Sequence, residues 1–360
     1  MDRLLALCMS PDQGGLELYF LKFVEFFQKK HDVFVACVEN SYITKHISKN
    51  KIECRPNTHL NRILNFFKIR KFIIKNKINI IHISWSNDKF LAVLLKIFTP
   101  HKIKIILYRQ MIISRPKRSI YHNFIYKRID LFLVITKKLY DQACQYLPIN
   151  NSKVHVLTYG IDKPSEETHI SKKAFFSKHG MDPNIFTIGI FSRIEPEKGQ
   201  HLVLEAVNQS VNKIQICIIG HSMDDDYIDQ LRETADRYGL SKYLKVISFV
   251  KSPMSYMPCF DLIILPTHEE TFGLVVAEAM LMGVPVIGSN AGGVPEIITH
   301  NHNGFLFQTK NSRDLKEKID HVVENKQSLD TIINNGIMFA NDEYDYHKHF
   351  ETFETLIEGL

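Results

Sequence analysis

The sequence predicts an α/β protein built from two doubly wound domains, each a parallel sheet with crossover helices. The first observation behind this is a regular alternation of short apolar runs with helical patterns. The second is size, because 360 residues with 45% hydrophobic content can bury two cores of ordinary domain size. The third is a reversal of charge. Residues 1–160 carry 27 Lys and Arg against 10 Asp and Glu, whereas residues 161–360 carry 18 against 29.

The order of elements follows from the apolar runs. In the first half the strand candidates are residues 4–9, 33–38, 78–83, 103–108, 131–135 and 154–157. In the second half they are residues 187–191, 214–219, 244–249, 262–265, 284–287 and 304–307. The polar segment 160–167, which contains Gly and Pro, separates the two series, so we expect domains at residues 1–163 and 164–343. Residues 344–360 form a short helical pattern whose packing partner is not fixed by position alone.

The expected compartment is the cytoplasm. No run reaches the ~18 apolar residues of a membrane span, and the start of the chain has only a short apolar stretch before Ser10 and Pro11, too short for a signal-peptide core. The six cysteines lie far apart, without a Cys-x-x-Cys pair. We therefore expect reduced, mostly buried thiols.

Residues 45–128 form a basic block, with 20 Lys and Arg against two acids. Such an excess predicts a polyanionic neighbour, either nucleic acid or an anionic membrane surface. Within the block, residues 60–78 have the pattern of a basic amphipathic helix. Its apolar positions are Leu60, Ile63, Leu64, Phe67, Ile74 and Ile78, widened by Phe66, Ile69, Phe72 and Ile73, and its cations are Arg62, Lys68, Lys71, Lys75 and Lys77. The pattern fits an interfacial helix on anionic lipid, and also a helix packed on a sheet with a solvated basic face.

The most informative motif is the segment 266–280, which follows an apolar strand and runs into a helix. Ligands bind at the carboxyl ends of strands in open α/β sheets, where Glu269 and Glu270 would lie. The helix N-terminus that follows would offer backbone N–H groups to a phosphate, from Phe272, Gly273, Leu274 and Val275. Glu278, further along the helix, would reach hydroxyl groups beside that phosphate. The alternative is a helix start decorated with acids that interact with its dipole.

Three further loops follow predicted strands. Arg193 and Lys198 emerge after the strand 187–191 and could hold a diphosphate, although a solvated surface loop is the ordinary alternative. Gly14 and Gly15 follow the first strand and could bring bare backbone against an anion, or form only a tight turn. The pair is not the Gly-x-Gly-x-x-Gly fingerprint, which argues against an NAD enzyme. The loop 289–296 repeats the same phosphate-tolerant layout.

Together these motifs resemble the retaining glycosyltransferase family 4, of GT-B architecture. Glu270 and Glu278 match the family's E-x7-E signature, which is the most specific of the motifs. Four other motifs stand in the family's order along the chain: Gly14-Gly15, Gly160-Ile161-Asp162, Arg193 to Lys198, and Gly292-Gly293-Val294-Pro295-Glu296.

The resemblance implies two Rossmann-like domains that face a central cleft, the first for the acceptor and the second for a nucleoside-diphosphate sugar. Glu278 would bind the ribose and Glu270 the sugar hydroxyls, while Arg193 and Lys198 would hold the diphosphate and stabilise the leaving group. The amides of Gly15, Leu274 and Val275 would add hydrogen bonds to phosphate. No metal or other cofactor would be required. The last helix, residues 344–360, would pack back on the first domain.

One departure concerns the acceptor domain. Family members often carry a His after the strand that here ends at Tyr108, and this chain has Arg109, Gln110 and Met111 there. Arg109 or Gln110 could contact sugar or phosphate, although Arg109 is a poor proton acceptor. His82 could serve near the acceptor, or be a satisfied structural residue.

The expected function is thus transfer of a sugar to a glycolipid or lipid-linked saccharide, with peripheral contact to an anionic membrane at its inner face. The alternatives are a transferase with a soluble acceptor, a nucleotide-sugar epimerase or hydrolase, and, most remotely, an RNA-binding protein. No nucleic acid partner is expected, because no RNA-binding motif accompanies the charge. The acidic run 224–226 predicts a helix cap rather than a metal site.

Overall fold

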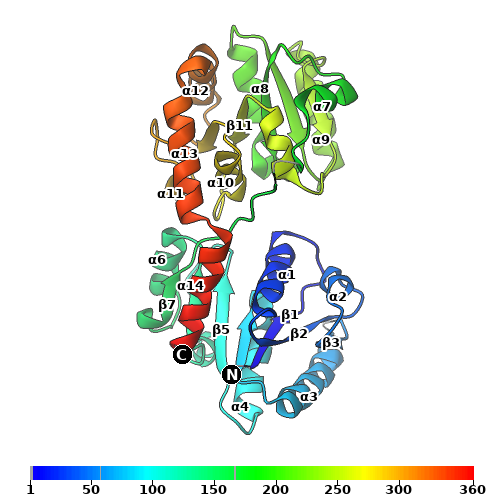
Figure 1. Ribbon diagram of the computed structural model, residues 1–360, viewed down its shortest axis with the longest axis vertical. Coiled ribbons are helices and arrows are strands. Elements are labelled where there is room, and N and C mark those ends of the chain that lie inside the picture. The colour runs from blue at the N-terminus through cyan, green and yellow to red at the C-terminus, as the bar shows by residue number, and fades with distance from the viewer. Residues whose placement is uncertain (1–2, 57, 166–167) are drawn as a thin grey trace. The chain divides into compact units, whose positions relative to one another are not determined.

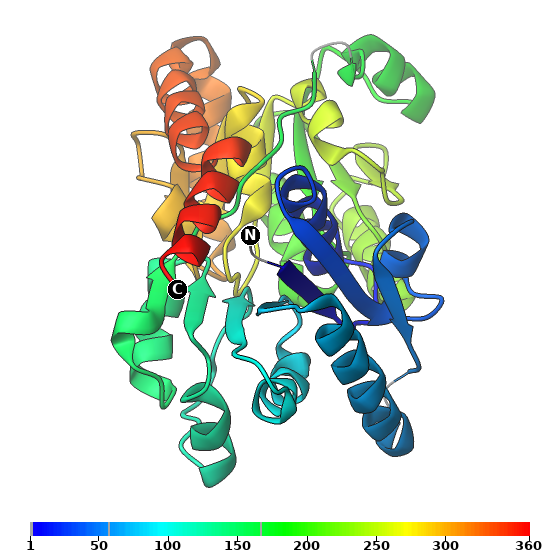
Figure 2. The same cartoon turned by 60° about the horizontal axis from the view of Figure 1, so that its bottom comes forward.

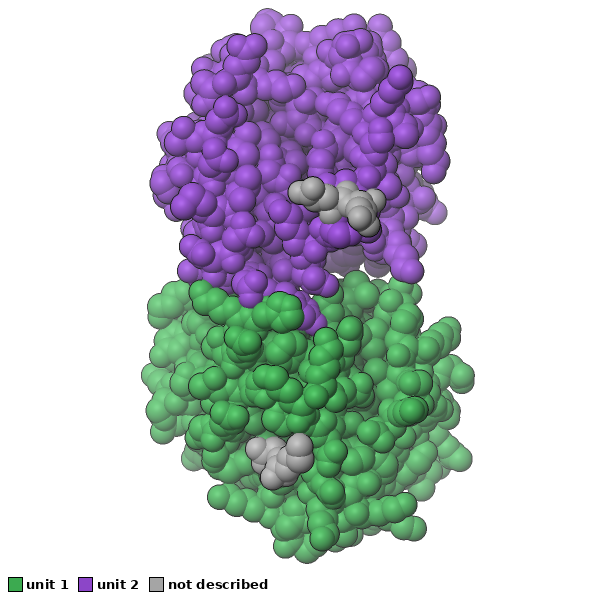
Figure 3. All heavy atoms as spheres, viewed as in Figure 1, with its two compact units in different colours: residues 1–158, 347–360 green, residues 159–346 purple. Residues whose placement is uncertain are grey.

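The computed structural model describes residues 3–56, 58–165 and 168–360, and it divides into two compact units (Figure 3). Unit 1 comprises residues 1–158 and 347–360, and unit 2 comprises residues 159–346. The boundaries therefore lie a few residues from those expected at 163 and 343. The cause is local, since Ile161 pairs with Asp345 and donates its N–H to the Tyr344 carbonyl oxygen at 2.8 Å, which keeps both connections in unit 2. The Glu166-Glu167 pair of the expected join lies outside the described residues.

Unit 1 is built on a seven-stranded parallel sheet of order β3-β2-β1-β4-β5-β6-β7 (Figure 1). The strands are β1 (Arg3–Cys8), β2 (Asp32–Val38), β3 (Lys51–Cys54), β4 (Ile80–Ile83), β5 (Lys104–Arg109), β6 (Leu131–Val134) and β7 (Val154–Val156). The helices and short 3-10 turns are α1 (Gly15–Phe27), α2 (Tyr42–His46), α3 (His59–Asn76), η1 (Ser86–Asp88), α4 (Lys89–Phe98), α5 (Ile120–Tyr126), α6 (Lys137–Tyr146) and η2 (Asn151–Lys153). Strands β4 and β6 are buried at every position, as expected for a sheet covered on both faces.

The C-terminal helix α14 (Tyr346–Glu358) packs within unit 1, although the whole of unit 2 lies between it and the rest of that unit in the sequence (Figures 1 and 2). Its rings meet those of α1, with Phe350 stacked on Phe26 at 4.9 Å and Phe353 tilted against Phe23 at 5.1 Å between centroids. Such aromatic contacts bury large areas at once. Helix α14 is therefore part of the core of unit 1.

Helix α3 packs on unit 1 by a narrow stripe and leaves an apolar face outside. Thr58 caps its first turn, and Lys77 ends it in the left-handed conformation. Ile69 and Ile73 are fully buried. Four of the predicted apolar positions are exposed: Leu60, Ile63, Leu64 and Phe67. Helical periodicity gives the existence of a stripe but not which part of it meets the sheet, and this helix carries apolar residues on more than one side.

Unit 2 is built on a six-stranded parallel sheet of order β10-β9-β8-β11-β12-β13. The strands are β8 (Phe186–Phe191), β9 (Ile214–Ile219), β10 (Leu244–Ile247), β11 (Leu262–Leu265), β12 (Val286–Ser289) and β13 (Phe305–Phe307). The helices and 3-10 turns are α7 (Lys172–His179), η4 (Pro196–Lys198), α8 (Gln200–Gln209), α9 (Asp225–Arg237), η5 (Pro253–Cys259), α10 (Leu274–Leu281), α11 (Val294–Ile297), α12 (Ser312–Glu324), η6 (Lys326–Ser328) and α13 (Asp330–Glu343). Helices α8, α9 and α12 share one apolar core with the sheet. The predicted pair of doubly wound parallel sheets is thus confirmed.

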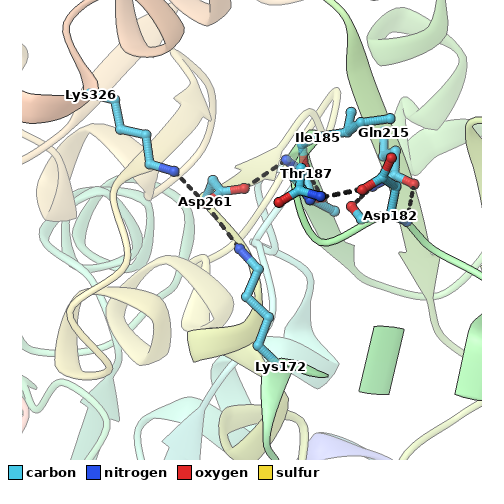
Figure 4. A network of polar contacts seen from close by, with 8 residues as sticks. Lys172, Asp182, Ile185, Thr187, Gln215, Asp261 and Lys326 are labelled. Atoms are coloured by element: carbon cyan, nitrogen blue, oxygen red, sulfur yellow. Dashed lines mark hydrogen bonds and ion pairs between the residues drawn. The ribbon is translucent and has the colours of Figure 1, made fainter. Parts of the chain in front are cut away.

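A polar network fixes the amino end of the second sheet (Figure 4). The Asp261 carboxylate, just before β11, accepts from the Thr187 N–H at 2.8 Å and from Lys326 and Lys172 at 2.7 and 3.1 Å. Burial alone would raise the pKa of Asp261, but the hydrogen bonds from Lys326 and Thr187 outweigh it, and the pKa is lowered. The network ties α7 and η6 to the two central strands.

The structure bears on two of the expectations about compartment, the state of the cysteines and the apolar length of the helices. All six cysteines are free, and five of them are buried while Cys144 is half-buried. Across residues 3–56, 58–165 and 168–360, none of the helices combines the length and the apolar character that a bilayer crossing needs.

Candidate functional site

The candidate site of unit 2 lies where strands β8 and β11 pair at the centre of the sheet. The chain turns outward from this pair in opposite directions, since β8 leads to β9 on one side and β11 leads to β12 on the other. A parallel sheet opens a crevice at such a switch point, beyond the carboxyl ends of the strands. The loop 192–199 after β8 and the loop 266–273 after β11 both emerge there and carry Arg193, Lys198 and Glu270. Helix α10, with the other predicted donor contacts of unit 2, starts directly after the second loop.

Lys198 and Glu270 form an ion pair at this switch point. The Lys198 Nζ lies 2.9 Å from the Glu270 Oε2, and both side chains are mostly buried. The loops that carry them are joined by their backbones, because the His268 N–H donates to the Glu197 carbonyl oxygen at 3.0 Å. Gly199 makes this approach possible, since its φ is +69° and a Cβ there would lie 2.2 Å from the Pro266 carbonyl oxygen.

The loop after β12 supports Glu270 from the other side. The Gly293 N–H donates to the Glu270 carbonyl oxygen at 2.9 Å. Gly292 has a φ of +62°, and a Cβ added to it would lie 1.6 Å from that same oxygen. The glycines that the sequence suggested as a second phosphate loop therefore hold Glu270 in place. The helix that follows, α11, is only a single turn.

Helix α10 begins beside the ion pair, after Gly273 with its φ of +101°. No side chain caps its first turn. The backbone N–H groups of Leu274 and Val275 point out of the helix start, where they and the helix dipole favour an anion. Glu278 lies one turn further along α10 and is half-buried.

Phe272 lies just before α10, where its backbone is predicted to face a phosphate. Its ring is buried, with edge-on contacts to Tyr159 at 5.2 Å and to Tyr344 at 5.4 Å. These rings anchor the start of α10 to the segments at the two ends of unit 2. Phe272 thereby positions the helix N-terminus instead of contacting a ligand through its side chain.

Arg193 is paired within its own loop. Its guanidinium pairs with Glu195 at 2.8 Å, and its side chain is 56% exposed. The backbone beside it is fixed, because the buried Gln200 donates to the Arg193 carbonyl oxygen at 2.8 Å and to the Ser192 Oγ at 3.0 Å. The Glu195 pair occupies one end of the guanidinium, so Arg193 could bring both Nη groups onto a phosphate only by leaving Glu195.

Tyr159 belongs to the surroundings of Glu270, although no sequence pattern marks it. Burial raises the pKa of its phenol, and the negative charge of Glu270 raises it further, which places the two groups near each other. An aromatic residue in a connecting segment has no chemical pattern of its own. Only the folded chain shows that Tyr159 and Glu270 share one environment.

Unit 1 has its own switch point, between strands β1 and β4. The loop with Gly14 and Gly15 emerges from β1, and the Glu17 carboxylate folds back over it, so that a Cβ on Gly14 would lie 3.3 Å from Glu17 Oε2. Glu17 is itself buried. A phosphate at Gly14 would meet this carboxylate, whereas Gly15 has open space around it. The structure therefore favours Gly15 over Gly14 as a contact for an anion.

His82 is wrong as a contact for the acceptor. Its ring is fully buried, stacked on Phe23 at 4.0 Å and edge-on to Phe353 at 5.3 Å. Neither ring nitrogen has a hydrogen-bond partner, and burial lowers its pKa to about 3. His82 is a neutral core residue of unit 1, the structural alternative considered for it.

Arg109 serves as an anchor for the loop that follows β5. Its Nε donates to the Met111 carbonyl oxygen at 2.6 Å and its Nη2 to that of Ile112 at 2.8 Å. Its Nη1 donates to the Ser86 Oγ at 2.6 Å. Three of the five N–H groups of Arg109 are therefore committed to the protein. The side chain of Gln110 is buried beside it.

The acidic run at 224–226 is a helix cap, as predicted. The Asp224 side chain accepts from the Tyr227 N–H at 3.3 Å and begins α9. Over the part of the chain that the structure describes, no group of three or more His, Cys, Asp or Glu side chains is arranged to hold a metal ion.

Two doubly wound units, one with a lysine, two glutamates and a helix N-terminus at its switch point, define an open α/β protein with a candidate ligand site at the carboxyl ends of its strands. Residues 13–163 match the model described as Glycosyltransferase Family 4, and residues 171–338 match the model described as Glycosyl transferases group 1. The two matches together span most of the chain. The chain therefore belongs to this family of glycosyltransferases.

Curated relatives include enzymes named for surface glycans. The chain is 27% identical over 176 residues to the capsular polysaccharide biosynthesis glycosyltransferase CapM of Staphylococcus aureus, an alignment that covers 48% of this chain and 45% of CapM. It is 24% identical over 331 residues to the O-antigen biosynthesis glycosyltransferase WclY of Escherichia coli, covering 89% of this chain and 88% of WclY. The chain thus spans about half the length of CapM and of one further curated relative.

Solved structures give the fold. The crystal structure of Anabaena HepE in complex with UDP matches with a TM-score of 0.87 at 21% identity, covering 99% of this chain and 100% of HepE. The expected GT-B architecture is thereby confirmed.

Proposed function

We propose that this protein transfers a sugar, with retention of configuration, from a nucleoside diphosphate to a hydroxyl of a glycolipid or lipid-linked saccharide. The observation that carries the proposal is the Lys198–Glu270 ion pair at the switch point of unit 2, next to the start of α10. A cation, a carboxylate and free backbone N–H groups are the set that a sugar diphosphate requires. The phosphates take the cation and the N–H groups, and the sugar hydroxyls donate to the carboxylate.

Each residue of this set has one role in the proposal. Lys198 and the N–H groups of Leu274 and Val275 hold the diphosphate, and Glu270 accepts from the hydroxyls of the transferred sugar. Glu278 accepts from the ribose hydroxyls. Arg193 joins the diphosphate by leaving Glu195. Since the HepE structures hold UDP and UDP-glucose, a uridine nucleotide is the first donor to test.

The reaction breaks the bond between the sugar anomeric carbon and the diphosphate oxygen, and it forms a bond between that carbon and the acceptor oxygen. The acceptor proton passes to an oxygen of the departing diphosphate on the same face of the sugar. This route preserves the configuration without a covalent intermediate on the protein. Lys198 stabilises the negative charge that develops on the leaving group, which is the largest catalytic contribution of the site in this proposal.

The acceptor class is proposed from the relatives and from the surface of unit 1. CapM and WclY are named for capsule and O-antigen synthesis. Helix α3 exposes Leu60, Ile63, Leu64 and Phe67 next to the exposed cations Arg62, Lys68, Lys71 and Lys75. Apolar side chains bordered by cations suit the surface of an anionic membrane. In this proposal α3 docks unit 1 on the cytoplasmic face of a membrane, where a lipid-linked acceptor is found.

The donor proposal is tested by a screen of nucleoside-diphosphate sugars with thermal shift and slow hydrolysis as readouts. One nucleotide sugar should raise the melting temperature of the wild type, because selective binding to the native state stabilises it. Lys198→Met and Glu270→Gln should weaken both the shift and the hydrolysis, whereas the exposed Lys251→Met should change neither. A folded wild type that no nucleotide sugar stabilises would remove the basis of the proposal.

The membrane part is tested separately by flotation with liposomes. Wild-type protein should float with vesicles that contain phosphatidylglycerol and stay behind with neutral phosphatidylcholine vesicles. Leu60→Ser with Phe67→Ser should lose flotation, and Val211→Ser, an exposed apolar residue of unit 2, should keep it. Equal recovery on neutral and anionic vesicles would sink this part and leave the donor proposal standing.

A further inference from the structure

Four cations gather at the carboxyl ends of β4 and β5 in unit 1. Lys89 begins α4, Arg109 ends β5, and Arg115 and Lys117 lie in the loop between β5 and α5. Strands β4 and β5 are neighbours in parallel register, with Ile83 opposite Leu107. The segments that follow them therefore meet at the edge of the sheet where ligands of open α/β folds bind. We call these four residues the cation cluster.

Hydrogen bonds fix two members of the cluster on one residue. The Lys89 Nζ donates to the Ser86 carbonyl oxygen at 2.8 Å, and the Arg109 Nη1 donates to the Ser86 Oγ at 2.6 Å. Arg109 also holds the loop that leads on to Arg115. Lys89 and Arg109 are thus fixed to the fold of unit 1, whereas Arg115 is exposed and Lys117 is half-buried.

The cluster has no acidic partner. Elsewhere in the basic block Lys51 pairs with Glu53, and Lys96 pairs with Asp130. Within residues 3–56, 58–165 and 168–360, none of the four cations has an Asp or Glu side chain at ion-pair distance. The adjacent Asp88 is buried and uses its Oδ2 to accept the Met9 N–H at 2.8 Å, and burial raises its pKa to about 7. Its charge opposes only part of the lowering of the Lys89 pKa.

The cations repel one another as a result. Burial lowers the pKa of Lys89 to about 8, and the charges of Lys117 and Arg109 add to the shift. Burial also lowers the pKa of Lys117, with contributions from Arg109 and Arg115. The charged forms of Lys89 and Lys117 are therefore destabilised by their cationic neighbours, and a bound anion would relieve that repulsion.

Two neutral polar groups at the same edge also lack partners. Gln110, next to Arg109, is 8% exposed and its Nε2 is buried without a hydrogen-bond acceptor. Ser84, just after β4, is 2% exposed and its Oγ has no partner. Buried donors without acceptors are rare in native proteins and call for an explanation. A ligand rich in acceptor oxygens would supply one.

We propose that the cation cluster binds a phosphate group of the acceptor, so that the acceptor is a phosphorylated or diphosphorylated molecule. Lys89, Lys117 and Arg115 bind its oxygens, and Arg109 adds the two N–H groups that the protein does not use. This rests on the proposed function, since it names the acceptor class of that same reaction. A monophosphate or diphosphate can belong to a lipid headgroup or to a water-soluble sugar phosphate, and both present the same chemistry to the cluster.

The first test is calorimetric titration of inorganic pyrophosphate into the full chain with UDP present in excess. The double variant Lys89→Met with Lys117→Met should bind pyrophosphate at least about tenfold more weakly than the wild type. The matched control, Lys29→Met with Lys45→Met, removes two exposed lysines of unit 1 and should bind like the wild type. Thermal melts of all variants report whether they fold.

The outcomes separate this inference from the proposed function. If Lys198→Met abolishes pyrophosphate binding and the cluster variant does not, the anion belongs to unit 2 and the inference fails while the donor proposal stands. If the wild type ignores nucleotide sugars but pyrophosphate binding still depends on Lys89 and Lys117, the cluster stands as an anion site and the proposed function fails. Equal pyrophosphate affinity in wild type and cluster variant overturns the inference outright.

A second experiment distinguishes the two sources of phosphate. One arm uses neutral phosphatidylcholine vesicles that contain a polyprenyl diphosphate, and the other uses titration with a hexose 6-phosphate. Binding in the first arm that requires Lys89 and Lys117 assigns a lipid headgroup. Binding in the second arm with the same requirement assigns a soluble sugar phosphate. If neither arm depends on these lysines, no phosphorylated acceptor of these kinds uses the cluster, and the inference is abandoned.

Discussion

The two sheets end in similar loops but treat charge in opposite ways. In unit 2 each cation of the site has a carboxylate partner, Glu270 for Lys198 and Glu195 for Arg193. In unit 1 the cation cluster has none among the residues that the structure describes. A sugar diphosphate presents hydroxyls as well as phosphates and needs acceptors and donors together, whereas a phosphate alone needs only donors. The comparison teaches that charge pairing, more than fold, separates the two binding edges.

The amino ends of the two sheets, in contrast, share one arrangement of hydrogen bonds. In unit 1 the Asp130 side chain accepts from the Ile105 N–H at 2.7 Å, while the Asp130 N–H donates to the Ile105 carbonyl oxygen at 2.9 Å. In unit 2 Asp261 makes the same reciprocal pair with Thr187 (Figure 4). Each aspartate also holds lysine from a neighbouring helix or turn. The structural ends are alike, and the binding ends differ.

The largest effect is expected from Lys198→Met. It should lower the turnover of the nucleotide sugar about 10²- to 10³-fold, because it removes the charge that stabilises the leaving group and leaves Glu270 unpaired. Steady-state hydrolysis and transfer rates measure it. The Lys89→Met variant should instead raise the KM for the acceptor. A cluster variant that lowers turnover of donor hydrolysis as much as Lys198→Met would erase the distinction between the two edges.

Gly292→Ala should destabilise unit 2 by about 2 to 4 kcal/mol, because the new methyl group would collide with the Glu270 backbone in a left-handed conformation. Chemical denaturation followed by circular dichroism measures this loss. Gly15→Ala is the matched control in unit 1, where open space surrounds the position. An unfolding free energy of Gly292→Ala equal to that of the wild type would contradict the role of this loop as the support of Glu270.

His82 should make the stability of unit 1 sensitive to acid. Burial lowers its pKa to about 3 in the folded chain, and the unfolded chain takes up the proton near 6.5. Stability is therefore full above pH 6.5 and falls as the pH drops from 6.5 towards 3. His82→Leu should remove about 2 kcal/mol of the loss between pH 7.5 and pH 5. Denaturant melts at the two pH values decide, and parallel losses in wild type and variant would disprove it.

Asp261→Asn should have the smallest of these effects, about 1 kcal/mol of unfolding free energy. The amide oxygen can still accept the Thr187 N–H, but the two lysines lose a charged partner, and both are partly exposed. Asp130→Asn should cost less again, since one lysine is involved there. Thermal denaturation of the two variants side by side measures the difference. A larger loss in Asp130→Asn would show that the two arrangements are not equivalent.

Much of the fold could be predicted because buried parallel strands are continuous apolar runs, as in β4, β9 and β11. Strand β3 (Lys51–Cys54) was not predicted, since it has four residues at the sheet edge and two of them are polar. In α3 the sequence predicted an apolar stripe but left open which of its residues pack on the sheet, because periodicity carries no information about the neighbouring sheet.

The candidate site divides in the same way. Lys198 and Glu270 could be found because each follows a strand in a chemically distinctive motif. The role of Gly292, the place of Tyr159 beside Glu270, and the anchoring of Arg109 depend on contacts between segments far apart in the sequence. The burial of His82 under α1 and α14 is of the same kind. Such contacts leave no local pattern, so the structure was needed to reveal them.

The packing of α14 in unit 1 has a consequence for how the chain matures on the ribosome. The rings of Phe23, Phe26 and Phe27 and the neutral His82 are covered by the last helix. Residues 1–158 leave the ribosome long before that helix is made, so these aromatic side chains stay uncovered throughout the synthesis of unit 2. We expect nascent unit 1 to expose this aromatic surface until translation has passed Phe353, and unit 2 to be the first part able to complete its own core.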